Sequence, residues 1–287
     1  MCAQRLKRDT EIGAAGLARL FSRGKRPTIS PEAAEKLPRL HVNVSLLFDV
    51  ENIANGLYSP LTKFMGSEDY TSVLNRGRLA NDEPWSIPIV LDMNNSDISG
   101  IREGEMVALS LVQGEVHSTV GVEEIFSYDK KEFCKRVYGT DNANHPGVLR
   151  TIEMGDTLIA GSVKVLRPLR TEFDKYTLSP AETKSAFREK GWKQVVAFQT
   201  RNVPHMGHEA LQKAALTFAD GIFINPLVGP KKPGDFKDEV ILATYEALIK
   251  SYYPKDRVVL GKENLPSDLV RREVVETIRR YDNPLVE

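Results

Sequence analysis

The chain has 287 residues, of which 41% are hydrophobic and 27% are charged, the composition of a globular protein that can bury a sizeable core. Lys+Arg and Asp+Glu both total 39, so the formal net charge is zero and nothing global favours a nucleic acid or an anionic membrane as a partner. Two cysteines, Cys2 and Cys134, cannot build a disulfide framework or a zinc centre, and no apolar run approaches the ~20 residues of a membrane span, so we expect a cytoplasmic protein.

Residues 1–26 are predicted to form an N-terminal extension. They are rich in Arg and Lys with leucines between them, which is also the pattern of an organellar presequence. Asp9, Glu11 and the scarcity of serine argue against a presequence. We therefore expect a short basic helix or a frayed extension.

Residues 27–170 are predicted to form a small β-rich domain. Short apolar and β-branched runs alternate with turn-rich stretches such as 94–104 and 145–147. Helices are expected after Ser67 and near Asp129. The predicted strands are Ser86–Met93, Met106–Val112, Val116–Phe126 and Thr157–Leu166.

Residues 171–287 show strands that alternate with helices, which predicts a parallel sheet in an α/β domain. Ser179 followed by Pro180 is the pattern of a helix N-cap with proline in the first helical position. Ligands of such sheets bind beyond the carboxyl ends of the strands. The predicted strands are Val195–Gln199, Gly221–Val228 and Val258–Gly261, and the predicted helices run from Ser179 to about Lys190 and over Glu209–Ala219, Asp238–Tyr252 and Pro266–Tyr281.

The loop after the first of these strands combines several groups suited to binding an anion. It leads into a helix, whose N-terminal N–H groups and partial positive charge attract anions before any side chain is counted. Arg201 adds a planar fork that matches phosphate or sulfate oxygens. His205 and His208 can donate to phosphate oxygens, and Gly207 lets the backbone approach a ligand. A single histidine at a helix start is usually a cap or a surface residue, but the convergence of these groups favours a functional loop.

A second loop, 226–235, follows the next predicted strand at the same edge of the sheet. Its Lys231 and Lys232 are candidates for phosphate contacts, although most Lys-Lys pairs lie in solvated turns. Asp235 could hold Mg²⁺ through water, which is weak evidence for a single carboxylate.

The remaining histidines carry less functional signal. His117 lies in an alternating stretch and is expected to be structural, His145 precedes Pro-Gly in a predicted turn, and His41 has no other chemical group near it. A Ser-His-Asp set, a Walker loop and a Gly-x-Gly-x-x-Gly motif are all missing from the sequence. No resident metal site is expected.

Together these motifs closely resemble the ATP sulfurylase (sulfate adenylyltransferase) family, from about Leu37 to Gly261. Several separate motifs in the family's order make coincidence a poor explanation. The matching stretches are 53–66, 87–92, 145–148, 195–208, 211–215, 226–235 and 252–257.

The resemblance implies a PUA-like β domain followed by a Rossmann-like nucleotidyltransferase domain. It implies the reaction of ATP with sulfate to give adenosine 5′-phosphosulfate and pyrophosphate, with Mg²⁺ on the leaving pyrophosphate. It also implies roles for six residues. Gln199 and Arg201 would hold sulfate, Thr200 and Asn202 would complete the catalytic and nucleotide loop, and His205 and His208 would stabilise charge at the phosphates.

The resemblance stops after Gly261, so the Rossmann-like domain 171–287 is expected to be incomplete. The family continues there with a Met-Arg-Tyr-Ala-Gly-Pro-Arg-Glu-Ala loop and a later Gly-Arg-Asp-His-Ala-Gly strand end, whereas this chain has a charged predicted helix. The alternatives are a partly active or non-catalytic nucleotide- or anion-binding paralogue or fragment, and an adenylyltransferase for another substrate. Residues 199–202 and the front domain argue against the last. An unfinished sheet edge makes a homo-oligomer possible.

Overall fold

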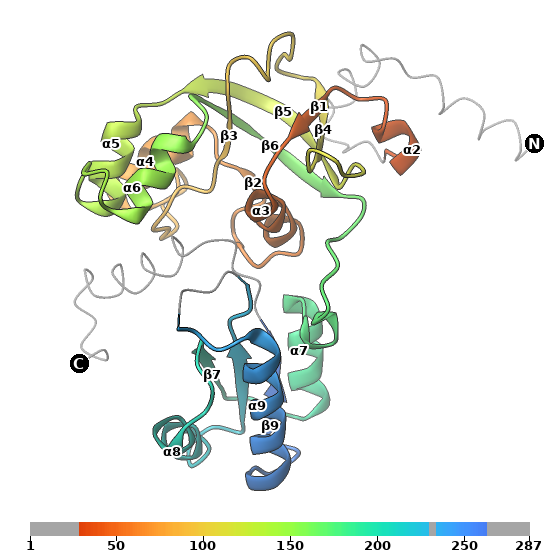
Figure 1. The fold of residues 1–287 in the computed structure, drawn as a ribbon, viewed down its shortest axis with the longest axis vertical. Coiled ribbons are helices and arrows are strands. Elements are labelled where there is room, and N and C mark those ends of the chain that lie inside the picture. The colour runs from red at the N-terminus through yellow and green to blue at the C-terminus, as the bar shows by residue number, and fades with distance from the viewer. Residues whose placement is uncertain (1–28, 230–233, 263–287) are drawn as a thin grey trace, which may run out of the picture. The chain divides into compact units, whose positions relative to one another are not determined.

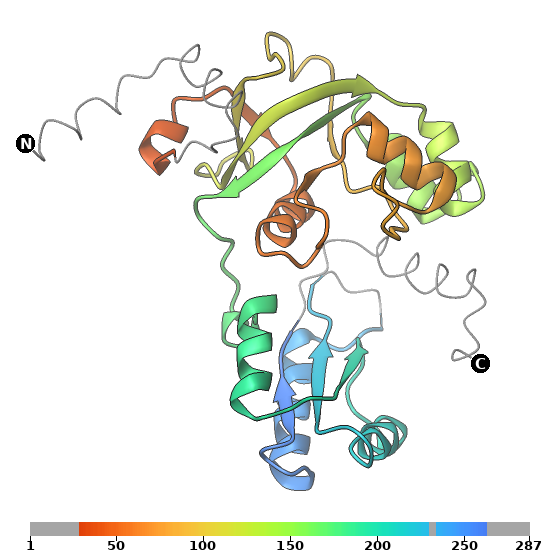
Figure 2. The same ribbon diagram turned by 180° about the vertical axis from the view of Figure 1, so that it is seen from behind.

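A computed structural model of the chain describes residues 29–229 and 234–262, and these residues form two compact units, 29–169 and 170–262. Figures 1 and 2 show the ribbon from opposite sides. The predicted extension 1–26 and the predicted helix Pro266–Tyr281 lie outside the described residues.

The first unit is built on a six-stranded sheet in which the central strands run in the order β1-β4-β5-β6-β2, while β3 also pairs with β6. β1 pairs with β4 in parallel, and the other pairs are antiparallel. The long β5–β6 ladder forms the centre of the sheet. The strands are β1 (Arg39–His41), β2 (Lys63–Phe64), β3 (Leu91–Met93), β4 (Met106–Ser110), β5 (Ser118–Ser127) and β6 (Thr157–Val165).

Helices cover this sheet unevenly. One helix, α3, packs against it through Leu47 and Val50, which are fully buried in the main core. Three others gather beside the sheet, where Tyr70 stacks on Phe133 with ring centroids 6.3 Å apart (Figures 1 and 2). The helices are α2 (Pro31–Ala34), α3 (Val44–Ala54), α4 (Ser67–Arg76), α5 (Lys130–Tyr138) and α6 (Pro146–Glu153).

Three local predictions for this unit are corrected by the structure. The strand expected over Ser86–Met93 is reduced to β3, and Pro88 within the expected range has no N–H to donate to a ladder. The turn expected at 145–147 is the start of α6, with Pro146 in its first helical position. The helix α3 was not predicted at all, although its buried residues have helical spacing.

The second unit is a three-stranded parallel sheet in the order β7-β8-β9, with β7 (Val195–Thr200), β8 (Gly221–Pro226) and β9 (Val258–Leu260). The predicted α/β class with a β-rich N-terminal part is therefore confirmed. The predicted cap at Ser179 is also confirmed, because Ser179 and Glu182 form a reciprocal capping box. The helices are η1 (Asp174–Tyr176), α7 (Pro180–Glu189), α8 (Met206–Ala215) and α9 (Asp238–Tyr252). The helix expected over Glu209–Ala219 is α8, which begins three residues earlier than predicted.

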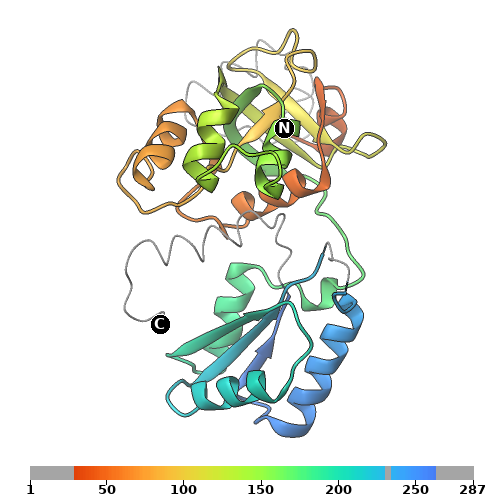
Figure 3. The ribbon, with the colours of Figure 1, turned by 60° about the vertical axis from the view of Figure 1, so that its left-hand side comes forward.

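The two faces of the second sheet are covered differently (Figure 3). Ile222 and Ile224 are fully buried and pack in one core with Tyr245 of α9. On the opposite face Phe223 meets Phe187 of α7, with ring centroids 5.7 Å apart. Alternate residues of β8 thus build two separate apolar layers, as the two-residue period of a strand requires.

The beginning and the end of the described part of this unit are fastened together by a clasp made of Thr171, Tyr176, Thr177 and Lys262. Thr177 and Lys262 form a parallel bridge, and the Lys262 N–H donates to the Tyr176 carbonyl at 2.8 Å. The Lys262 ammonium is buried and donates to Thr171 Oγ1 at 2.7 Å. The clasp therefore ties the segment that precedes α7 to the end of β9.

Candidate active site

The candidate site begins where β7 ends. Gln199 is exposed, while Thr200 next to it is buried. The Thr200 carbonyl accepts the Leu227 N–H at 2.8 Å, and Thr200 Oγ1 accepts the Asn202 N–H at 3.2 Å. The hydroxyl thereby closes a tight turn that carries Arg201 away from the strand.

An ion pair joins the two loops that follow β7 and β8. Arg201 Nη2 donates to Asp235 Oδ2, and both side chains are partly buried. The sequence suggested Asp235 as a ligand of Mg²⁺ through water, whereas in the structure this carboxylate is bonded to Arg201. The guanidinium has five N–H donors in a rigid fork, so fixing one nitrogen orients the others toward an incoming anion.

His205 is the N-cap of α8 and uses one ring nitrogen for that purpose. Its Nδ1 accepts the Gly207 N–H at 3.1 Å, which assigns the proton of the neutral ring to Nε2. A Cβ on Gly207 would lie 3.0 Å from His205 Cε1, so a glycine in this position gives the imidazole room. The free Nε2–H of an exposed ring is then available to a ligand.

The two site histidines are stacked. The rings of His205 and His208 have centroids 3.8 Å apart at an interplanar angle of 26°, and Phe198 meets the His208 ring edge-on at 5.5 Å. Burial, and then the charge of His205, lower the pKa of His208, while the Val203 carbonyl acts in the opposite direction. His208 is therefore neutral at neutral pH, and the stack avoids two adjacent positive charges.

Not every predicted site residue can be placed. The loop positions Gln199 through Asn202 and both histidines lie together at the N-terminus of α8, but Lys231 and Lys232 lie outside the described residues. Of the flanking residues, Gly229 donates its N–H to Asp238 Oδ2 at 3.1 Å, which ties this loop to the start of α9.

The histidines outside the site have structural partners. His117 is buried, and its Nε2 lies 3.0 Å from Glu51 Oε1, an oxygen that also accepts the Leu169 N–H at 2.6 Å. His145 caps α6 as His205 caps α8, because its Nδ1 accepts the Gly147 N–H at 3.2 Å. The chain therefore uses the same His-x-Gly cap twice, once in each unit.

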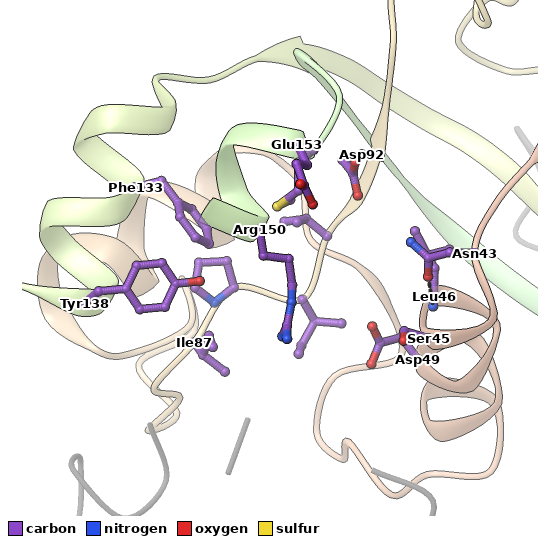
Figure 4. Close-up of a pocket in the computed structure, with 14 residues that line it drawn as sticks. Asn43, Ser45, Leu46, Asp49, Ile87, Asp92, Phe133, Tyr138, Arg150 and Glu153 are labelled. Atoms are coloured by element: carbon purple, nitrogen blue, oxygen red, sulfur yellow. Dashed lines mark hydrogen bonds between the residues drawn. The ribbon is translucent and has the colours of Figure 1, made fainter. Parts of the chain in front are cut away.

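The first unit contains a cavity of about 360 Å³ that the sequence did not indicate (Figure 4). Its apolar wall includes Phe133 and Tyr138, and the Arg150 side chain extends into it beside the α3 residue Asp49. Burial raises the pKa of Asp49 to about 7, and the Tyr58 hydroxyl donates to its Oδ1 at 2.7 Å. The lining residues come from α3, α5, α6, β3 and the segment before β3, so no local sequence pattern could have revealed the cavity.

Residues 29–229 and 234–262 contain no helix that is long and apolar enough to cross a membrane. They also contain no group of three or more His, Cys, Asp and Glu side chains placed to hold a metal ion.

Comparison with known families gives a result for each unit. Residues 11–168 match the model of a PUA-like domain, and residues 174–268 match the model of ATP-sulfurylase. The chain belongs to the ATP-sulfurylase family. The resemblance seen in the sequence motifs is thereby confirmed, together with the PUA-like assignment of the first unit.

Curated relatives of this family are similar along most of the chain. The sulfate adenylyltransferase of Hyperthermus butylicus is 50% identical over 230 residues, which are 80% of this chain and 59% of the relative. That of Ignicoccus hospitalis is 50% identical over 245 residues, 85% of this chain and 64% of the relative. The chain thus spans about three fifths of the length of these relatives.

A solved structure shares the fold. The hexameric APS kinase from Thiobacillus denitrificans superposes with a TM-score of 0.63 at 21% identity, over 87% of this chain and 47% of that one. At this identity the likeness concerns the fold alone.

Proposed function

We propose that the chain acts as a sulfate adenylyltransferase, which converts ATP and sulfate into adenosine 5′-phosphosulfate and pyrophosphate. The observation that carries the proposal is the convergence of Gln199, Arg201 and the stacked pair His205–His208 at the N-terminus of α8. The names of the curated relatives support the same reaction.

In this reaction a sulfate oxygen attacks the α-phosphorus of ATP, and the bond from that phosphorus to the bridging oxygen of the β-phosphate breaks. Sulfate is a poor nucleophile, so positioning and charge stabilisation must do most of the work. We assign Gln199 and the free N–H groups of Arg201 to sulfate. Because Asp235 already holds one nitrogen of Arg201, the guanidinium is oriented before sulfate arrives.

The other four site residues are assigned to the nucleotide side. Thr200 and Asn202 form the turn that the phosphates approach, and their bond at 3.2 Å fixes its shape. His205 Nε2–H and the neutral His208 stabilise the negative charge that develops on the oxygens around the α-phosphorus. The N-terminus of α8 adds its N–H groups to the same charge.

Mg²⁺ is proposed as the ion that accompanies ATP and shields the charge of its phosphates. Asp235 does not fit as a protein ligand for it because its carboxylate is engaged by Arg201. Mg²⁺ commonly keeps several waters and binds through substrate phosphates.

ATP, sulfate, adenosine 5′-phosphosulfate and pyrophosphate are the partners that follow from this proposal. A cytoplasmic location remains a prediction from the cysteine content. A homo-oligomer is also proposed, since β7 forms an edge of the described sheet, with Ala197 and Gln199 exposed.

A second candidate function is a protein that binds the nucleotide or the anion without turnover. The open edge at β7 favours it, since the described sheet has three strands and few elements to enclose a substrate. The two candidates share the loop after β7 and differ in whether bound ATP reacts.

The test is AMP formation from ATP and Mg²⁺ with molybdate in place of sulfate, on the purified 287-residue chain. A mixed anhydride with molybdate should hydrolyse at once, which draws the reaction forward and makes weak activity measurable. AMP that depends on molybdate and disappears in Arg201→Ala is the expected result. ATP binding without AMP would instead support the second candidate.

A further inference from the structure

The cavity in the first unit has no part in the proposed chemistry, and it combines two unlike walls. Its volume of about 360 Å³ is in the range of small-molecule sites, and all the residues that line it belong to one unit. One wall is apolar, with Ile87 and Phe133 buried and the Tyr138 ring half-buried. Figure 4 shows Ser45 and Asp49 of α3 on the opposite side. A ligand that fits this cavity therefore needs an apolar part and a polar part.

Arg150 brings a positive charge into the cavity that no described residue neutralises. The side chain extends into the cavity from α6 (Figure 4). It makes no ion pair or hydrogen bond with residues 29–229 or 234–262. A guanidinium presents five N–H donors in a rigid fork that matches a carboxylate. Arg150 can therefore anchor an anionic group of a ligand.

Asp49 supplies the opposite charge and points toward the Arg150 side chain (Figure 4). Its Oδ1 accepts the Tyr58 hydroxyl at 2.7 Å, but it forms no ion pair with a cation that the structure describes. Burial raises the pKa of Asp49 to about 7, since no paired cation offsets the loss of hydration. An ammonium group of a ligand would supply the missing partner.

A cation and a carboxylate that face one cavity without pairing match a ligand that carries both charges close together. A simple anion would meet the carboxylates of Asp49, Asp92 and Glu153, which outnumber Arg150 among the described lining residues. A simple organic cation would be repelled by Arg150. The phosphate chain of a nucleotide would find one basic side chain there. A free α-amino acid avoids these conflicts, because its carboxylate and its ammonium group are attached to the same carbon atom.

We propose that this cavity binds a free α-amino acid with an apolar side chain. The ligand carboxylate accepts from the Arg150 guanidinium, the ammonium group donates to Asp49, and the side chain packs on Phe133 and Tyr138. Aromatic rings favour edge-on or offset contacts with another ring, so L-phenylalanine is the probe. This site does not depend on the reaction proposed for the second unit.

Isothermal titration calorimetry of the unaltered 287-residue chain tests the charge requirement. L-Phenylalanine carries both charges, whereas 2-phenylethylamine lacks the carboxylate and 3-phenylpropionate lacks the ammonium group. We expect L-phenylalanine to bind at one site per chain. Its affinity should exceed that of either analogue by about tenfold, because each analogue lacks one charged hydrogen-bond partner.

Two variants assign the charges. Arg150→Gln should weaken the binding of L-phenylalanine by about tenfold and strengthen that of 2-phenylethylamine, because the repulsion is removed. Asp49→Asn, which keeps an acceptor for Tyr58, should weaken L-phenylalanine to a similar extent and strengthen 3-phenylpropionate. The matched control is Arg136→Gln on α5, which removes a guanidinium that pairs with Glu132 at 3.9 Å and does not line the cavity. It should bind L-phenylalanine as the unaltered chain does.

The melting temperature of each variant without ligand shows that it is folded, and Arg150→Gln should not change it, since Arg150 has no described partner to lose. The proposal is overturned if none of the three compounds binds, or if one analogue binds as tightly as L-phenylalanine. It is also overturned if Arg136→Gln weakens binding as much as Arg150→Gln, since the effect would then not arise in the cavity. The molybdate assay decides the proposed function separately.

Discussion

Replacing His205 by Asn separates the chemistry of the imidazole from its role as a helix cap. His205 accepts the Gly207 N–H at 3.1 Å, and the Asn side chain is among the best substitutes for such a cap. We therefore expect the free energy of unfolding to change by less than about 0.5 kcal/mol. For a unit of this size that limits the shift in melting temperature to about 4 °C.

The effect of His205→Asn on turnover should be far larger. The substitution removes a donor aimed at charge that develops in the transition state, and losing one such donor typically lowers kcat about 10²–10³-fold. The stack with His208 at 3.8 Å is lost as well. The assay is AMP release with molybdate, measured beside the melting temperature of the same preparation.

His145→Asn is the matched control, because His145 caps α6 through the same bond to Gly147 at 3.2 Å. It should leave turnover within about twofold of the unaltered chain, since a preserved cap changes little. The reasoning is refuted if His205→Asn keeps more than a third of the activity. It is equally refuted if the two variants lose activity to the same extent.

Three further predictions concern charge. Arg201→Ala should abolish AMP release and also lower the free energy of unfolding by about 1–3 kcal/mol, read from urea midpoints, because it removes the ion pair with the partly buried Asp235 carboxylate. Because the pKa of His208 is lowered by folding, its contribution to stability is present above about pH 6.5 and is lost as the pH falls through the lowered pKa. His208→Gln should remove this fall in melting temperature at acidic pH. The pKa of Asp49, raised to about 7, has the opposite sign: its contribution to stability is complete below the ordinary carboxyl pKa of about 4 and is lost as the pH rises to 7. Asp49→Asn, which keeps an acceptor for Tyr58, should flatten the fall in melting temperature between about pH 4 and 7.

The parts of the fold that could be predicted are those specified by residues close together in the sequence. The cap at Ser179 and the apolar runs of β7 and β8 are encoded within a few neighbouring residues, and they were predicted within one or two positions. The helix that begins at 145–147 could not be predicted in this way, because His-Pro-Gly suits both a turn and the first turn of a helix. In the structure this segment packs against α5, where the Tyr138 ring lies 5.1 Å from the His145 ring. Such packing between separate helices cannot be seen in a single sequence.

The same distinction applies to the site. The six site residues lie within the continuous segment 199–208, from the end of β7 to the start of α8, so their types and spacing could be recognised together. The contact of Arg201 with Asp235 joins the loop after β7 to the loop after β8, 34 residues further along the chain. Contacts between residues so far apart in the chain arise from the tertiary fold, and no spacing pattern in the sequence reveals them.

The clasp between Thr177 and Lys262 has a mechanical consequence. The two backbones pair in parallel at the beginning and at the end of the described part of the second unit, so a pull on the chain at both points slides the pairing strands past each other. The contacts of Lys262 with Tyr176 and Thr171 would resist this shear together and break together. When the chain is stretched in a single-molecule force experiment, the clasp should therefore open first, in one abrupt step, before the six-residue ladder between β7 and β8 separates.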